Sequence, residues 1–480
     1  MAPGEKWIYE SGLHPGGLAD HLLDALEKQG TVLLGPACSD PEIRPQSVSH
    51  PATESGPVPC SPLYGFGPAG SALLFANPVE TITCSSTKDL VPFFSRLEAA
   101  LNAGFFTAGW FSYEFGALLE PRLRQKIFSD IPSAPDSEAR FIQKARGCPA
   151  PLAWLGLYES CQVLDRASFL SACNRISEDF FQSRWCREGN EPEISFPISS
   201  QEFCQAIEDI HNLIRAGDTY QVNYTISGEF AVYCNPASLF FHLWQRQPVS
   251  FSAYVNNAPY RILSLSPELF FRLDNGWLSS MPMKGTAPRG SAPDEDRHIR
   301  KTLKNDMKNR AENVMIVDLI RNDLGRISET GSVHVPELFR IEEYETLFQM
   351  VSLVQGRLRA DTGWQQIFQA LFPCGSITGA PKIRTMEIIS DLEKGPRGIY
   401  TGAMGYIAPY GSNAVFNVAI RTLEFIKNQG RIGVGAGITI DSKPEMELEE
   451  TLLKARFLSS QLKMLQKRKR DCCLIRGRAG

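Results

Sequence analysis

The strongest constraint on the fold is a series of strand-like segments that follow one another with no helix predicted between them. Four such segments lie between residues 220 and 273, with the sequences YQVNYTISGEFAVY, FSAYVNNA, YRILSLS and LFFRL. Each is rich in β-branched and aromatic residues and is bounded by turn residues. Strands joined without a long crossover pair antiparallel. This part of the chain therefore predicts an antiparallel sheet.

Helical patterns lie on either side of these strands. Ser199 and Glu202 form a capping-box pattern, and apolar residues then recur at helical spacing until Gly217, which predicts a helix over about 200–216. Residues 294–327 are also helical in pattern. Runs of strands followed by runs of helices are typical of an α+β domain.

The C-terminal part repeats this alternation. Three further strands are predicted at residues 401–408, 414–426 and 430–440. A last helix is expected from Ser442, because Ser442 and Glu445 form a second capping box.

Composition excludes several classes of protein. The chain has 480 residues, of which 43% are hydrophobic and 21% are charged, as in folded globular proteins. A net charge of -4 supplies no field for holding a nucleic acid. The twelve cysteines show no C-x-x-C spacing, so neither a disulfide framework nor a zinc site is expected. Because no signal-like start and no membrane-length apolar stretch is found, we expect a cytoplasmic protein without a membrane span.

Punctuated stretches divide the chain into regions. Residues 35–61 are rich in Pro, Ser and Gly and predict a loop, whereas the aromatic segment 109–120 is expected to be buried. We place an N-terminal region at 1–190, a catalytic region at 191–465 and a basic, disordered tail at 466–480.

Three glutamates are candidate metal ligands. Glu312 shares a helical face with apolar residues, and Glu447 and Glu450 are spaced to share another. Most glutamates simply face water. The alternative is that Glu312 and Glu450 provide oxygen ligands for Mg²⁺.

Two glycine-rich stretches and two charged residues are further candidates. Residues 375–382 and 433–438 match neither a P-loop nor a dinucleotide fingerprint, so they are either turns or backbone sites for an anion.

Lys284 follows a strand among small residues and is either solvent-facing or a desolvated nucleophile. Glu268 lies between apolar neighbours, where burial would raise its pKa and suit it to act as a general acid.

A set of motifs resembles the chorismate-utilising enzyme family. The motifs run in the family's order from about residue 200 to 460 and read SPELFF, MKGTAPRG, AENVMIVDLIRNDLGRI, GSITGAPKIRTMEII, RGIYTGAMGYI, NVAIRT and GAGITIDSKPEMELEET. The resemblance implies a mixed α/β fold with two stacked, mainly antiparallel sheets flanked by helices. It is greatest to the branch that aminates chorismate on the route to para-aminobenzoate and folate.

The resemblance implies roles for the two charged residues. Lys284 resembles a nucleophile that attacks ring C2 of chorismate, and Glu268 resembles the acid that protonates the departing C4 hydroxyl. Ammonia would then attack C4 and release the lysine, giving 4-amino-4-deoxychorismate. Relatives that make anthranilate have alanine at the position of Lys284, and a histidine at that of Gln349.

The resemblance also implies binding residues, a cofactor and a partner. Mg²⁺ would be held by Glu312, Glu447 and Glu450. Ammonia would come from a glutamine amidotransferase subunit, since the chain has no G-x-C-x-G glutaminase motif. The residues that match the chorismate pocket are Tyr400, Arg421, Gly435, Ala436, Gly437, Ser376 and Lys382.

Three alternatives stay open. The chain could be an anthranilate synthase component I, an isochorismate or salicylate synthase, or a non-catalytic scaffold of the same fold. Tryptophan-regulated relatives carry a motif resembling L-L-E-S where this chain reads VLLGPACS, so we expect no feedback inhibition by tryptophan.

Overall fold

Two large sheets form the body of the protein. The computed structural model describes residues 6–9, 15–37, 65–128, 151–182, 194–231, 234–344 and 347–455. Sheet A contains, in spatial order, β1 (Trp7–Tyr9), β7 (Cys161–Leu164), β3 (Ala72–Phe75), β2 (Thr31–Leu34), β9 (Phe251–Asn257), β10 (Tyr260–Ser266), β19 (Thr422–Ile426), β20 (Gln429–Ile438), β8 (Gln221–Ala231) and β16 (Gly379–Ala380).

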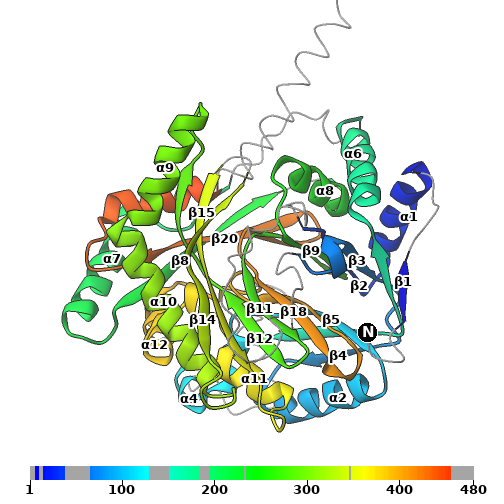
Figure 1. The fold of residues 1–480 in the computed structure, drawn as a ribbon, viewed down its shortest axis with the longest axis horizontal. Coiled ribbons are helices and arrows are strands. Elements are labelled where there is room, and N and C mark those ends of the chain that lie inside the picture. Colours follow the sequence, from blue (N-terminus) through cyan, green and yellow to red (C-terminus); the bar gives the residue numbers. More distant parts are fainter. Residues whose placement is uncertain are drawn as a thin grey trace, which may run out of the picture.

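Sheet B lies against sheet A (Figure 1). It contains β13 (Met283–Pro288), β15 (Leu347–Arg357), β12 (Trp277–Met281), β11 (Leu269–Asp274), β18 (Asn413–Val418), β17 (Ala403–Ile407), β5 (Phe106–Phe111), β6 (Ala153–Tyr158) and β4 (Glu80–Cys84), with β14 (His334–Glu343) paired to β15.

The pairing is almost entirely antiparallel, as the sequence predicts. Among the described strands, only β1 and β7 pair in parallel. Buried side chains from both sheets form one apolar cluster between them, including Phe75 and Phe251 of sheet A and Phe106 and Met404 of sheet B. Strands from both sides of residue 190 occur in each sheet. The region boundary predicted at residue 190 therefore divides the sequence but does not divide the fold into layers.

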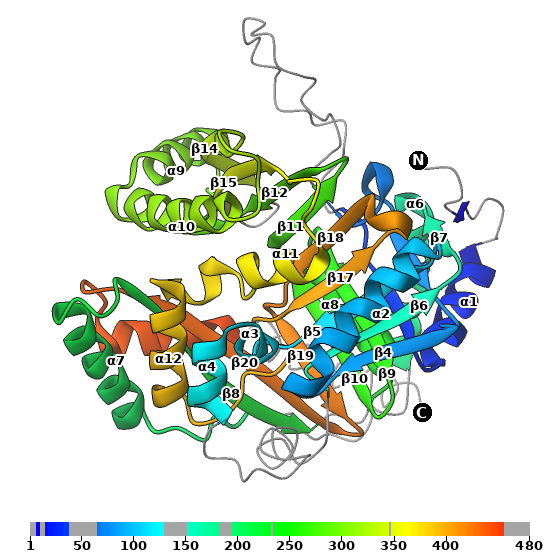
Figure 2. The same cartoon turned by 90° about the horizontal axis from the view of Figure 1, so that it is seen from below.

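Helices cover the outer faces of the two sheets (Figures 1 and 2). On sheet A lie α1 (Pro15–Glu27), α6 (Arg166–Gln182) and α8 (Pro236–Arg246). On and beside sheet B lie α2 (Leu90–Asn102), α3 (Phe115–Leu119), α4 (Pro121–Phe128) and α11 (Trp364–Leu371). The others are α7 (Ser200–Arg215), α9 (Pro293–Asn305), α10 (Met307–Gly325), α12 (Lys382–Leu392) and a last helix at 444–455.

Two local predictions are confirmed, the start of α7 and the burial of residues 109–120. The Ser199–Glu202 capping box is present at the start of α7, whose buried face carries Phe203, Ile207 and Ile210. Residues 109–120 are buried in β5 and α3, apart from the partly exposed Glu120.

The six cysteines of the described residues are free thiols. Within the described ranges, no helix is both long enough and apolar enough to cross a membrane.

One local prediction was wrong, and two others are refined by the structure. Helix α8 lies between β8 and β9, where no helix was expected, and it begins at an Asn235 cap followed by proline. The stretch 294–327 is helical as predicted, and it is divided into two helices, because Asp306 ends α9 and caps α10 by accepting from the Asn309 N–H. The predicted last helix is present but begins at residue 444, two residues later than expected, and the Ser442 hydroxyl accepts from the Thr439 N–H.

The segment 414–426 is also divided, with consequences for the site. The sequence predicts one strand, whereas β18 belongs to sheet B and β19 to sheet A. Between them the chain turns at Arg421, whose φ of 50° lies in the left-handed region. Most of the predicted loop at 35–61 and the basic tail lie outside the described residues.

Two helices and two long strands form a lobe beside the body (Figure 2). Helices α9 and α10 pack on β14 and β15 around a small apolar cluster that includes Leu303, Phe339 and Phe348. This lobe matters for the site because it carries Glu312 on α10 and the residues that hold Lys284.

Candidate active site

The site forms where two chain segments cross between the sheets. One crossing joins β10 to β11 and contains Glu268, and the other joins β18 to β19 and contains Arg421. The crossings are hydrogen bonded to each other, because the Ser266 hydroxyl donates to the Val418 carbonyl over 2.6 Å and the Val418 N–H donates to the Glu268 carbonyl over 3.1 Å. The Leu265 N–H likewise donates to the Arg421 carbonyl. The crossing that carries Glu268 and the crossing that carries Arg421 are therefore held together by hydrogen bonds.

Glu268 is a buried carboxyl group, as the sequence predicts. Its residue is only 4% exposed, and the Ser376 hydroxyl donates to its Oε1 over 2.6 Å. Burial raises the pKa of Glu268 to about 7, although the Ser376 hydrogen bond and the nearby Lys284 act in the opposite direction. A carboxyl group with this pKa holds its proton over part of the neutral range and can deliver it to a leaving group.

Lys284 is aimed by a β-bulge. Between Met283 and Thr286 the pairing of β13 with β15 slips by one residue, and Gly285 has a φ of 81°. Gln349 of β15 holds the bulge, since its Nε2 donates to the Gly285 carbonyl over 3.0 Å and its Oε1 accepts from the Thr286 hydroxyl over 2.8 Å. The geometry thus gives Gln349 a positioning role that the sequence did not reveal.

The amine of Lys284 has no hydrogen bond or ion pair within the described residues. Burial lowers its pKa, against the attraction of the Glu312 and Glu268 carboxylates. Its Nζ lies over the backbone of Gly437, where an added Cβ would be 3.3 Å away. A lowered pKa increases the fraction of neutral, nucleophilic amine.

Gln221 is a member of the site that the sequence reading missed. It is 1% exposed, and neither its amide nitrogen nor its amide oxygen has a hydrogen-bond partner in the described structure. Its Nε2 lies 2.8 Å from the position of a Cβ on Gly437, on the same side as Lys284. A buried amide without partners is costly unless a ligand satisfies it. The strand pattern around Gln221 gave no signal that this position is buried.

Strand β20 supplies a glycine-lined wall. The Tyr400 ring lies against Gly433, where a Cβ would come 2.1 Å from the ring. Strand β19 pairs with β20 only as far as Ile432. On that side, the backbone of β20 beyond Ile432 pairs with no other described strand, so its N–H and C=O groups can bind another partner. Of the predicted residues, Gly435 and Gly437 lie on the Tyr400 and Lys284 side, whereas Ala436 is buried in the main core.

Arg421 and Lys382, the two basic residues of the predicted pocket, differ from each other in their surroundings. The Arg421 guanidinium has no hydrogen bond or ion pair within the described residues, and burial lowers its pKa, which suits a group that awaits an anion. Lys382 is already paired, because its Nζ lies 2.5 Å from the Asp323 carboxylate and 2.8 Å from the Leu371 carbonyl. Lys382 therefore joins α12 to α10.

The three glutamates come from α10 and the last helix. Burial raises the pKa of Glu312, and both Glu447 and Glu450 add to this increase, so the three carboxylates act on one another. Glu312 lies 3.9 Å from Lys308, and Glu450 lies 2.9 Å from Lys454. In the described structure no three acidic, His or Cys side chains are already gathered around one point.

A group of mutually repelling carboxylates is nevertheless a suitable donor set for Mg²⁺. This ion is typically held by one or two carboxylates together with water and substrate oxygens, so three preassembled ligands are not required. Glu312 and Glu450 would be its protein ligands, with Glu447 beside them.

The fold and site define a two-sheet enzyme with a buried acid and a desolvated amine facing a glycine-rich strand. A family model described as chorismate binding enzyme matches residues 55–460. The chain therefore belongs to the chorismate binding enzyme family, and the resemblance of its motifs is confirmed.

Individual relatives refine this result. The chain is 42% identical over 272 residues to "Aminodeoxychorismate synthase" of Streptomyces pristinaespiralis, which covers 56% of this chain and 38% of that protein. It is 33% identical over 372 residues to "Aminodeoxychorismate synthase component 1" of Salmonella typhimurium, covering 76% and 78% of the two chains. The chain thus spans well under half of the first relative and most of the second.

A solved structure supports the same fold. Anthranilate synthase component I from Streptococcus pneumoniae superposes with a TM-score of 0.64 at 25% identity, covering 87% of this chain and 96% of that one. The predicted fold of two stacked, mainly antiparallel sheets is therefore confirmed.

Proposed function

We propose that this protein aminates chorismate to 4-amino-4-deoxychorismate, using ammonia from a glutamine amidotransferase partner. The observation that carries the proposal is the unpaired, desolvated amine of Lys284 beside the buried acid Glu268. Relatives named aminodeoxychorismate synthase agree with this choice. The name "component 1" of the Salmonella typhimurium relative suggests a second component, and a cytoplasmic location suits the pathway to folate.

The proposed reaction balances with the groups present. Neutral Lys284 attacks C2, the C4–O bond breaks, and protonated Glu268 gives its proton to the departing hydroxyl, which leaves as water. Ammonia then attacks C4 and the C2–N bond to Lys284 breaks. The Glu268 carboxylate takes the extra proton from the new ammonium group, and both residues return to their starting states.

Other residues of the site bind and orient the substrate in this proposal. Arg421 would pair with a carboxylate of chorismate, and Tyr400, Ser376 and the free edge of β20 would provide further contacts. The Gln221 amide would donate to the ring substituents near Lys284. Mg²⁺, when bound at Glu312 and Glu450, would neutralise the ring carboxylate.

Anthranilate synthesis is the second candidate, because the solved relative with the same fold has that title. Purified protein with chorismate, Mg²⁺ and an ammonium salt at mildly alkaline pH separates the two when the products are identified by mass spectrometry. We expect aminodeoxychorismate from the wild type and loss of most turnover in Lys284→Ala. Anthranilate with pyruvate would overturn the proposal, and a Lys284→Ala variant as active as wild type would overturn the mechanism.

A further inference from the structure

Three buried polar side chains form a short hydrogen-bonded chain that ends at the proposed acid. The Ser376 hydroxyl donates to Oε1 of Glu268 over 2.6 Å, and the Cys374 Sγ lies 3.2 Å from the same Ser376 oxygen. Each of the three residues is at most 5% exposed. The proposed reaction uses Glu268 and Ser376, but it gives no part to the Cys374 thiol.

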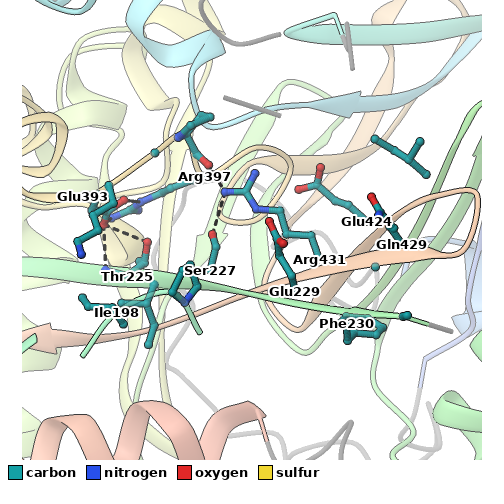
Figure 3. A pocket seen from close by; sticks show the side chains of 18 of the residues that line it. Ile198, Thr225, Ser227, Glu229, Phe230, Glu393, Arg397, Glu424, Gln429 and Arg431 are labelled. Carbon is teal, nitrogen blue, oxygen red and sulfur yellow. Dashed lines mark hydrogen bonds and ion pairs between the residues drawn. The ribbon is translucent and has the colours of Figure 1, made fainter. Parts of the chain in front are cut away.

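A short turn fixes the positions of the thiol and the hydroxyl. Cys374 is followed by the 3₁₀ helix η4 (Gly375–Ile377), and the Thr378 hydroxyl donates back to the Cys374 carbonyl over 3.1 Å. At the other end of the turn, the Ile377 carbonyl accepts from the buried guanidinium of Arg397 over 2.9 Å. Arg397 itself lies in the wall of a cavity on sheet A (Figure 3). The turn is therefore held at both ends.

The direction of the hydrogen-bonded chain follows from the protons that are available. A serine hydroxyl has one proton and two acceptor lone pairs. An ionised Glu268 can only accept, so the single Ser376 proton is directed to it, and the Cys374 thiol must be the donor in its contact with Ser376. The thiol keeps its proton for this purpose, because burial and the nearby Glu268 charge raise the pKa of Cys374 to about 12.

This direction decides which oxygen of Glu268 carries the acidic proton. While Ser376 donates to Oε1, the proton of the neutral carboxyl group lies on Oε2. In the reversed chain, Oε1 would donate to Ser376, and Ser376 would donate to sulfur, which is a weak acceptor. The acidic proton would then be engaged by Ser376 and could not be given to a departing hydroxyl.

We propose that Cys374 is a positioning residue whose thiol turns the Ser376 hydroxyl toward Oε1 and thereby keeps the acidic proton of Glu268 on Oε2. This inference rests on the proposed function. The proton on Oε2 passes to the departing C4 hydroxyl, which leaves as water, while the thiol and the serine hydroxyl keep their own protons. When Glu268 later takes a proton from the new ammonium group, Oε1 is still occupied, so the proton returns to Oε2.

Removing the thiol donor tests this role. In Cys374→Ala, kcat should fall about fivefold, because one neutral hydrogen bond to Ser376 is lost, and KM should stay within about twofold of wild type, because no contact to the substrate is removed. Cys374→Ser restores a donor at the same place, and its kcat should return to within about twofold of wild type.

The pH profile of kcat gives a result that a loss of packing would not produce. The profile should show two apparent pKa values, which belong to Glu268 and Lys284. Hydrogen bonding to a carboxylate lowers its pKa, so a Ser376 hydroxyl that is no longer held should raise the pKa of Glu268. One apparent value should therefore rise in Cys374→Ala while the other stays, and Cys374→Ser should restore the first. The charged groups that act on this chain, Lys284 and Lys382, are unaltered in both variants.

Cys173→Ala is the matched control. Cys173 of α6 is also buried, its thiol donates to the Phe241 carbonyl over 3.3 Å, and burial raises its pKa to about 12. Its removal should leave kcat and the pH profile unchanged. Wild-type kcat and an unmoved profile in Cys374→Ala would overturn the positioning role, as would equal losses in Cys374→Ala and Cys374→Ser with both apparent pKa values unchanged. The product of the wild type tests the proposed function separately, because it does not depend on the variants.

Discussion

Replacing Glu268 by glutamine should make the protein more stable and abolish its turnover. Glutamine keeps the shape and can still accept the Ser376 hydrogen bond, but it carries no charge and no acidic proton. Burial raises the pKa of Glu268 from its ordinary 4.5 to about 7. Ionising this group therefore costs the folded protein roughly 3 kcal/mol more than it costs the unfolded chain.

The sign of the effect fixes its pH dependence. Because the folded pKa is the higher one, the folded state holds the proton more tightly, and the stability due to that proton is complete below pH 4.5. It is lost as the pH rises from 4.5 to 7, and the loss is constant above that. The advantage of Glu268→Gln over wild type should consequently grow by about 2.5 kcal/mol between pH 5 and pH 8.5.

Urea unfolding followed by tryptophan fluorescence at the two pH values measures this difference. Because the test compares the advantage of Glu268→Gln at two pH values, any constant effect of the amide on packing cancels. Glu159→Gln, which removes an exposed carboxylate, should show no such growth. An equal advantage for Glu268→Gln at pH 5 and pH 8.5 would refute the view that Glu268 is a desolvated acid.

The remaining predictions concern the site geometry, the metal and regulation. Gly437→Ala places a methyl 2.8 Å from Gln221 and 3.3 Å from Lys284, so turnover should fall at least about tenfold with an unchanged melting temperature, while Gly325→Ala, in open space, should be neutral. Gln349→Ala frees the Gly285 bulge and should lower kcat more than it raises KM; equal kcat would exclude a positioning role. Chelation with EDTA should abolish turnover until Mg²⁺ is restored, and calorimetry should show weakened Mg²⁺ binding in Glu450→Gln; undiminished binding would remove Glu450 from the ligand set. Tryptophan titration should leave turnover unchanged, and potent inhibition would contradict this.

Much of the architecture follows from local sequence patterns. The succession of strand-like segments without long crossovers predicted antiparallel pairing, and the capping box at Ser199 located the start of α7. These features depend on periodicity and on hydrogen bonds between near neighbours, which a sequence displays directly. Glu268 was also identified correctly as a buried acid, since apolar residues surround it in the sequence. Helix α8 was missed, although its Asn235 cap and following proline are a local signal.

The geometry of the site depends on contacts between distant segments. Residues 414–426 form an unbroken strand-like run, but the chain switches sheets at Arg421 because Leu265 and Glu268, more than 140 residues away, bind the turn. The β-bulge that orients Lys284 is held by Gln349. Lys382, which was predicted to bind the substrate, forms an ion pair with Asp323 instead. Gln221 was recognised as a site residue only from the structure, where its buried amide has no hydrogen-bond partner among the described residues. The sequence by itself thus determined which residue types the chain brings to the chemistry, whereas tertiary packing decided which of them remain unpaired, because pairing depends on neighbours that the linear order does not place together.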